Sequence, residues 1–276
     1  MSIKPTTGIR KIYKFARQTE NISNLKLRIG IAGRKKIVKT IRDTFGADPI
    51  SSVVEIPDMS FAGAFDLLII ALKDVAELTE KAHIIEKSAA PVIIVFEQSK
   101  AVTDKTLDKL EGLIDLNSLI FLKESDFQKR LHNAVVRELD DKKLAIARVL
   151  PLFRNRIAAD IISDSSKQNA LIGAAVFLPG ADMPILTLNQ MKMVLELAAV
   201  HNESLSVERA KELLVTFGSG YIFRALARQL LGFVPGPGFI VKGIVAYTGT
   251  RALGQLAHEY FTRGAFPLEI GNKSKS

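Results

Sequence analysis

Continuous apolar runs alternate with amphipathic segments over the first half of the chain. The runs "LKLRIGIAG", "FDLLIIAL" and "PVIIVFE" have the length of strands and lack polar alternation, which is typical of parallel strands covered on both faces. "SSVVEIP" and "SLIFL" are shorter strand candidates, and "KKIVKTIRDTFG", "VAELTEKAHIIEKSA" and "DKTLDKLEGLI" have helical patterns. This alternation predicts a small doubly wound, mainly parallel α/β domain over residues 25–123.

The second half of the chain has helical patterns without strand candidates. Phe127, Leu131 and Val135 form a partial apolar stripe, and a single connecting helix is expected over residues 124–150. After Pro151, segments rich in small residues predict an all-α domain over residues 151–265, and a disordered tail is expected over 266–276. The predicted fold class is therefore α/β, with the sheet domain followed by a helical domain.

The net charge is +9, and the first 28 residues carry seven basic residues against a single Glu20. Residues 1–24 are predicted to form a basic amphipathic segment. In "IRKIYKFAR" the apolar positions have helical spacing, and the basic residues Arg10, Lys11, Lys14 and Arg17 surround them. Two interpretations stay open, a helix packed on its own protein and contact with an anionic membrane surface. Nucleic acid is not an expected partner, because no binding motif is present and aromatic residues make up 7% of the chain.

Composition limits the chemistry that this chain can perform. The absence of cysteine excludes disulfides and thiolate chemistry and fits a cytoplasmic setting. The four histidines, His83, His132, His201 and His258, have no ligand-like spacing. No cofactor, metal or catalytic residue is therefore expected. No apolar stretch reaches the ~18 to 20 residues of a simple membrane span, so we expect a cytoplasmic protein associated with the cytoplasmic membrane surface.

One stretch resembles a phosphate-binding loop. Gly33, Lys39 and Thr40 match the pattern G-x-x-x-x-G-K-[ST] directly after a predicted strand, with Val38 in place of the second glycine. These three residues are the nucleotide-binding candidates. Branched Val38 restricts the backbone where a phosphate would have to approach, so the motif leaves nucleotide binding open.

The α/β segment resembles an Era-like GTPase domain whose functional motifs are degraded. Where that family has its guanine-reading N-K-x-D motif at the end of the strand "PVIIVFE", this sequence has Glu97, Gln98, Ser99 and Lys100, so Lys100 replaces the aspartate. Asp58 is not followed by the glycine of a D-x-x-G motif. Too few residues separate Thr40 from the next strand for a first switch loop. The resemblance therefore predicts a pseudo-GTPase.

Two motifs lie in the predicted helical domain, "FLPGADMPILTLNQMKM" and "VPGPGFIVKGIVAYTGTRALGQLAHEY". They resemble the YcjF-like, GTPase-associated domain-of-unknown-function family of bacteria and plastids, over roughly residues 152–263. The resemblance rests mainly on Pro179, Asp182, Gln190, Pro235, Gly238, Thr250 and Gly254. It implies a helical domain that commonly follows an Era-like module and is often membrane-associated, with no established reaction.

Two segments of these motifs keep alternative interpretations. Asp182 suits the N-cap of the following helix, and the alternative is contact with an ion or a lipid headgroup. "VPGPG" is either a hairpin tip at the membrane or a corner between buried helices, and Phe233 and Phe239 are the candidate membrane contacts beside it.

Together these features predict a non-catalytic adaptor or regulatory protein. Its expected partners are an anionic membrane surface, a protein such as a GTPase, or both. The first alternative is a switch that retains GTP or ATP binding through the three candidate residues. The second is a soluble, homo-oligomeric helical binding module.

Overall fold

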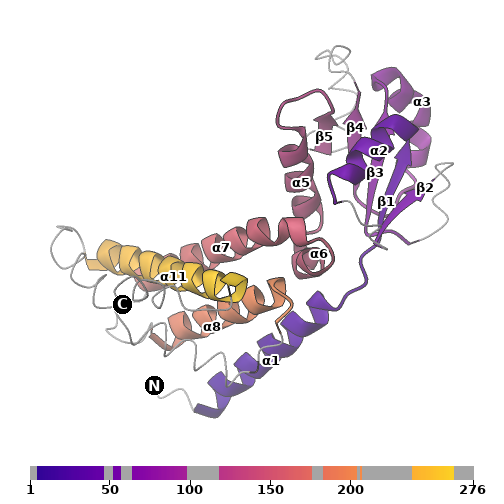
Figure 1. Cartoon of the computed structure of the whole chain (residues 1–276). Helices are drawn as coiled ribbons and strands as arrows, with labels where there is room; N and C mark the ends of the chain where they lie inside the picture. The colour runs from indigo at the N-terminus through magenta and orange to yellow at the C-terminus, as the bar shows by residue number, and fades with distance from the viewer. Residues whose placement is uncertain are drawn as a thin grey trace, which may run out of the picture. The chain divides into compact units, whose positions relative to one another are not determined.

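The structure, a computed structural model, describes residues 5–46, 52–56, 64–97, 118–175, 183–203, 206 and 238–263 (Figure 1). It consists of two compact units, one of residues Leu25–Phe153 and one of Met1–Asn24 together with Arg154–Ser276. We call them the α/β unit and the helical unit. The basic N-terminal segment thus belongs to the helical unit, and the whole segment expected to connect the domains, residues 124–150, belongs to the α/β unit.

The described part of the α/β unit contains one five-stranded parallel sheet. Its strands are β1 (Ile29–Gly33), β2 (Val53–Ile56), β3 (Leu67–Leu72), β4 (Val92–Phe96) and β5 (Leu119–Phe121), in the order β2-β1-β3-β4-β5. Each neighbouring pair is parallel. The α/β class predicted from the apolar runs is confirmed, and this strand order is that of flavodoxin-like doubly wound folds.

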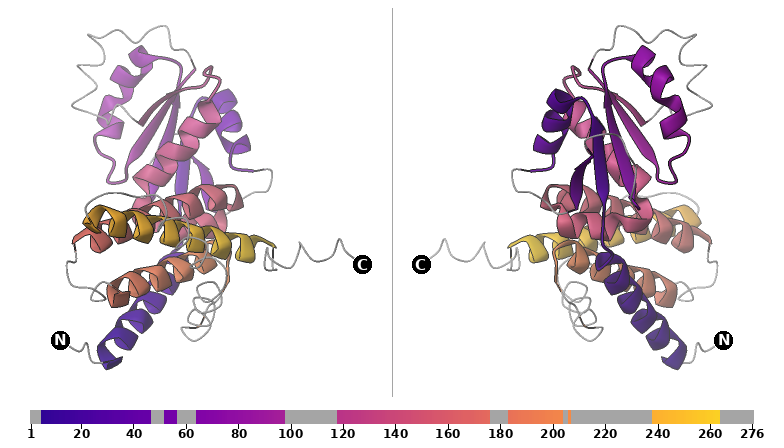
Figure 2. Two further views of the ribbon diagram at one scale, coloured as in Figure 1. Left: turned by 90° about the vertical axis from the view of Figure 1, so that its left-hand side faces the viewer. Right: turned by 90° about the vertical axis from the view of Figure 1, so that its right-hand side faces the viewer.

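Helices cover both faces of this sheet. They are α2 (Lys35–Asp43), α3 (Val75–Ile85) and α5 (Phe127–Glu138), and α2 and α3 lie on opposite faces (Figure 2). Helix α6 (Lys143–Val149) follows α5. The predicted helix over 104–114 lies outside the described residues. In place of one helix over 124–150 the chain forms α5 and α6. The helix stops because Leu139 leaves helical geometry at φ −119° and ψ 33°, and a 3-10 turn follows over Asp140–Lys142.

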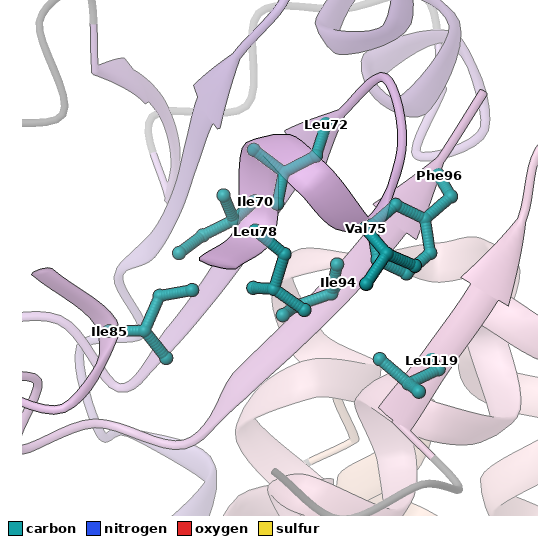
Figure 3. Packing of buried hydrophobic residues seen from close by; sticks show 8 residues of the cluster. All are labelled: Ile70, Leu72, Val75, Leu78, Ile85, Ile94, Phe96 and Leu119. Atoms are coloured by element: carbon teal, nitrogen blue, oxygen red, sulfur yellow. The ribbon is translucent and has the colours of Figure 1, made fainter. Parts of the chain in front are cut away.

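The core of the α/β unit forms where α3 packs on the sheet. Val75 and Leu78 of α3 lie against Ile70 and Ile94 of the neighbouring strands β3 and β4 (Figure 3). All six residues of β3 are buried. A strand covered on both faces needs apolar residues at every position, which explains the uninterrupted run "LLIIAL".

The described part of the helical unit consists of α1 (Pro5–Ser23), α7 (Arg154–Ala175), α8 (Met183–Val200) and α11 (Gly238–Arg263). Helices α7 and α11 cross closely, and a Cβ atom at Gly173 would lie 3.0 Å from the carbonyl oxygen of Lys242. Helix α1 packs on α8, where Ile12 contacts Met191 and Leu195. Among the described helices, none has the length and apolar character needed to cross a membrane.

Candidate functional site

The order of the sheet reverses between β1 and β3, and ligands of doubly wound folds bind outside the carboxyl ends of strands at such a switch point. Gly33 ends β1 with φ +114°, and a Cβ atom there would lie 2.0 Å from the carbonyl oxygen of Ala71. Arg34 follows, and its backbone N–H donates to the same oxygen at 3.1 Å. Arg34 is the single residue between β1 and α2, so the connection is very short.

This short connection leaves no loop of free amides at the phosphate-loop motif. The backbone N–H groups of Ile37 and Val38 both donate to the carbonyl oxygen of Arg34 at 2.9 Å. Both side chains are buried. Lys39 and Thr40 lie further along α2 and are exposed, and the Thr40 hydroxyl donates to the Lys36 carbonyl at 3.2 Å. A phosphate loop needs successive amides pointing at the anion, and here the helix already uses them.

A charged cluster occupies the carboxyl ends of β1 and β3 instead. We call it the switch-point cluster: Arg34, Lys73, Glu77 and Lys81. The Glu77 carboxylate accepts from Arg34 Nε at 3.1 Å, from Lys81 Nζ at 2.9 Å and from the Lys73 backbone N–H at 2.8 Å. Partial burial alone raises the pKa of Glu77, but the hydrogen bonds from Lys73, Lys81 and Arg34 outweigh it and lower the pKa to about 2. Glu77 is thus an anion held by three donors.

Sequence reasoning missed this cluster, although one local signal was present. Asp74 caps α3 and accepts from the Glu77 backbone N–H at 3.2 Å. Asp74 and Glu77 have the spacing of a capping box, in which the second residue reaches back to the amides before the helix. The hydrogen bonds that Asp74 and Glu77 make at the start of α3 could therefore have been predicted from the sequence. The contact with Arg34 could not, because Arg34 lies in another element.

The guanine-reading and magnesium-binding motifs of the predicted GTPase site lie only partly within the described residues. Glu97 follows β4 and is half-buried, while Gln98, Ser99 and Lys100 lie outside the described residues, as does Asp58. The geometry therefore gives the position of the phosphate-loop residues, while nucleotide binding and the guanine-reading and magnesium-binding motifs stay predictions.

In the helical unit the structure brings Gln190 and Thr250 of the two sequence motifs together. The Thr250 hydroxyl accepts from Asn169 Nδ2 at 2.7 Å and from Gln190 Nε2 at 3.2 Å. Asn189 Nδ2 donates to Asn169 Oδ1 at 2.8 Å. We call these four residues the amide–hydroxyl cluster. Asn169 and Thr250 are fully buried, so the cluster links α7, α8 and α11 from within.

Of the other motif residues, the structure describes Gly254 and Gly238 but not the rest. Gly254 lies where α11 meets α7 and α8, and a Cβ atom there would come within 2.8 Å of Ile162 and 3.0 Å of Met193. Gly238 is the first residue of α11. Pro179, Asp182, Pro235 and Phe233 lie outside the described residues, and Phe239 is described only as backbone of α11. The N-cap interpretation of Asp182 therefore stays a prediction.

Two histidines that appear unrelated in the sequence meet in the helical unit. His201 Nε2 and His258 Nδ1 lie 3.0 Å apart, after the end of α8 and on α11. Burial lowers the pKa of His201, and with the nearby His258 and Arg154 it reaches about 4. Burial also lowers the pKa of His258, against the opposing effect of Glu259. The described residues hold no group of three or more side chains suited to a metal ion. The pair is therefore best described as neutral and hydrogen-bonded.

The histidine pair predicts acid sensitivity of the helical unit. The unfolded chain takes up protons near the ordinary pKa of 6.5, and folded His201 does so only near about 4. Stability is therefore complete above pH 6.5 and is lost as the pH falls toward 4. Between pH 7 and 5 we expect a loss of about 1 kcal/mol, after allowance for solvent screening of half-exposed rings.

Tyrosine fluorescence during urea unfolding measures this loss selectively. The chain has no tryptophan, and its four tyrosines (13, 221, 247 and 260) all belong to the helical unit. His201→Gln should flatten the pH dependence. His132→Gln is the control, because His132 belongs to the α/β unit, where its Nε2 donates to the Thr44 carbonyl at 2.9 Å. An unchanged slope in His201→Gln would contradict the assignment.

Helix α1 presents its basic residues to solvent. Arg10, Lys11, Lys14 and Arg17 are exposed. Three of them, Arg10, Lys14 and Arg17, follow i, i+4, i+7 spacing and lie on one face. Ile12 on the opposite face is 5% exposed and packs on α8, so part of the apolar face of this helix is occupied within its own unit.

Large apolar side chains are exposed at one end of the helical unit. They are Leu171 of α7, Ile185 of α8, and Ile240, Ile244 and Val245 of α11. These elements meet there, since Gly173 approaches Lys242, and Asn169 Nδ2 donates to the Leu186 carbonyl at 3.5 Å. Exposed apolar residues grouped in this way are typical of interaction surfaces.

Fold and site together define a doubly wound α/β unit with a charge-filled switch point, joined in one chain to a helical unit. No family model and no curated protein matches this chain. The resemblance of the helical motifs to a GTPase-associated family therefore stays a prediction.

Proposed function

We propose that this protein is a non-catalytic adaptor in which the α/β unit is a pseudo-GTPase that serves as a protein-binding surface. The observation that carries the proposal is the direct passage from β1 into α2 through Arg34 alone. Because the amides of Ile37 and Val38 bond within the helix, they are not free to hold a phosphate at this motif. The alternative of a nucleotide-binding switch would require this helix turn to unwind.

The proposed adaptor attaches to an anionic membrane surface at the cytoplasmic face. The exposed basic face of α1 supports electrostatic attachment, with ~1 kcal/mol for each Lys or Arg near such a surface. Because Ile12 packs on α8, α1 contributes charge more than apolar insertion. The exposed Ile240, Ile244 and Val245 of α11 supply an apolar contribution.

Vesicle sedimentation tests this attachment. The intact chain should co-sediment with phosphatidylserine vesicles, and replacing Arg10, Lys14 and Arg17 by Gln should weaken binding about 100-fold, since three cations are lost. The matched control replaces Lys35, Lys36 and Lys39 by Gln, which removes the same charge from the exposed surface of α2. Equal losses in the two triple variants would contradict a specific role for α1.

A homo-oligomeric helical module is the second candidate function. It is favoured by Leu171 of α7 and Ile185 of α8, which are 71% and 44% exposed. Light scattering of the intact chain without detergent distinguishes the two candidates. A dimer that Leu171→Glu converts to a monomer would support the oligomeric module, while a monomer would favour the adaptor.

A further inference from the structure

The Glu77 carboxylate lies where doubly wound folds bind external ligands. We propose that the switch-point cluster is an anion site of phosphate type which the chain fills with its own Glu77, so that an external phosphate group enters only when this carboxylate is withdrawn. This inference goes beyond the proposed function. It names the ligand class of a site that the adaptor keeps closed.

Three donors from separate segments converge on one carboxylate. Arg34 comes from the β1–α2 connection, the Lys73 N–H from the β3–α3 connection, and Lys81 from α3 itself. A guanidinium, an ammonium and a backbone amide are the donor types that hold phosphate groups in proteins. The side chain of Glu77 is 17% exposed, whereas those of Arg34 and Lys81 are 48% and 29% exposed. The donors are thus more open to solvent than the anion that they hold.

The position of the donors is fixed by the sheet. Gly33 of β1 pairs with Ala71 of β3, and the Arg34 N–H donates to the Ala71 carbonyl, so Arg34 begins at the meeting point of the two strands. The hydrogen bond from the Lys73 N–H to Glu77 uses an amide directly after β3. These positions belong to the switch point that doubly wound folds use for binding. The location of the donors at the switch point therefore supports a binding site independently of their charges.

The other charged groups nearby set the expected affinity. Exposed Lys35 and Lys36 at the start of α2 favour an anion, while Asp74, which caps α3, opposes one. With Glu77 neutralised, we expect an inorganic phosphate dissociation constant on the order of millimolar, as for an exposed site with few contacts.

Thermal unfolding of the full chain with increasing inorganic phosphate tests the inference, with chloride added to hold ionic strength constant. Glu77→Gln keeps the shape of the side chain and removes the negative charge that neutralises Arg34 and Lys81. Phosphate should raise its melting temperature progressively, by about 3 °C at tenfold excess over the dissociation constant, because the ligand binds only the native state. The intact chain and Glu80→Gln, which neutralises an exposed carboxylate one turn along in sequence on the same helix, should not respond.

Further variants show which results would overturn the inference. Adding Arg34→Gln to Glu77→Gln should abolish the response, and its persistence would overturn the site. A response of Glu77→Gln no larger than that of Glu80→Gln would also overturn it. If Glu77→Gln does not fold, Glu77→Asp replaces it. This variant keeps the charge but withdraws it by one methylene, and it should show a smaller rise, so that no rise would refute the inference.

Titrations with nucleotides distinguish failure of this inference from failure of the proposed function. GTP and ATP should act on Glu77→Gln no more strongly than pyrophosphate, because the donors contact only a phosphate group. Saturable nucleotide binding by the unmodified chain would contradict the pseudo-GTPase proposal, whereas failure of the Glu77→Gln arm alone would contradict only this inference.

Discussion

Gly33→Ala is expected to lower the free energy of unfolding of the α/β unit by about 3–5 kcal/mol. Gly33 has φ +114°, and the new Cβ atom would lie 2.0 Å from the Ala71 carbonyl oxygen and 2.9 Å from its carbon. Those atoms are backbone of β3, so no side-chain rotation relieves the contact. The β1–β3 ladder must separate, and the hydrogen bond from the Arg34 N–H to Ala71 weakens with it.

Gly46→Ala is the matched control for this prediction. Gly46 has nearly the same φ of +113°, but the atom nearest to its added Cβ is Leu152 Cδ1 at 3.9 Å. The control therefore carries backbone strain without the clash and should cost about 1 kcal/mol. Hydrogen-exchange mass spectrometry of peptides covering β1 and β3 measures both variants. Equal protection in the two variants would show that the approach of Gly33 to Ala71 does not determine stability.

Thr250→Val should be the most damaging conservative change in the helical unit, with an expected loss of about 2–4 kcal/mol. The replacement has nearly the same shape, but it removes the oxygen that accepts from Asn169 Nδ2 and Gln190 Nε2. Asn169 is fully buried, so its amide cannot turn to water. A buried donor left without a partner costs its full desolvation free energy.

Thr248→Val provides the comparison on the same helix. The Thr248 hydroxyl donates to the Ile244 carbonyl at 2.8 Å, and its loss leaves a group that water can reach. A change within about 0.5 kcal/mol is expected. Tyrosine fluorescence during urea unfolding reports both variants. If Thr250→Val costs no more than Thr248→Val, the amide–hydroxyl cluster does not hold the three helices together.

The sheet was predictable because its signal is local. Each strand is a short apolar run, and a strand buried on both faces, such as β3, leaves a run that no exposed helix would show. Gly46, just past the end of α2, marks a helix end in the same local way. The break at Leu139 was missed because residues 124–150 keep helical character on both sides of it.

The candidate sites were less predictable, because they depend on contacts between distant residues. Arg34 and Glu77 are separated by 43 positions and Asn169 and Thr250 by 81. Single residues such as Arg34 or Asn169 carry no sign of a partner in another element. The phosphate-loop pattern, in contrast, is present in the sequence but does not form a phosphate loop in the structure. Its residues are in register in the sequence, but the helix begins immediately after Arg34 and places Lys39 away from the end of the strand.

Calorimetric titration of the unmodified chain with GTP and with ATP, in the presence of Mg²⁺, tests the central claim most directly. The account predicts no saturable heat up to millimolar nucleotide, because the amides of Ile37 and Val38 are bonded within α2. Saturable binding with micromolar affinity that Lys39→Ala abolishes would contradict it.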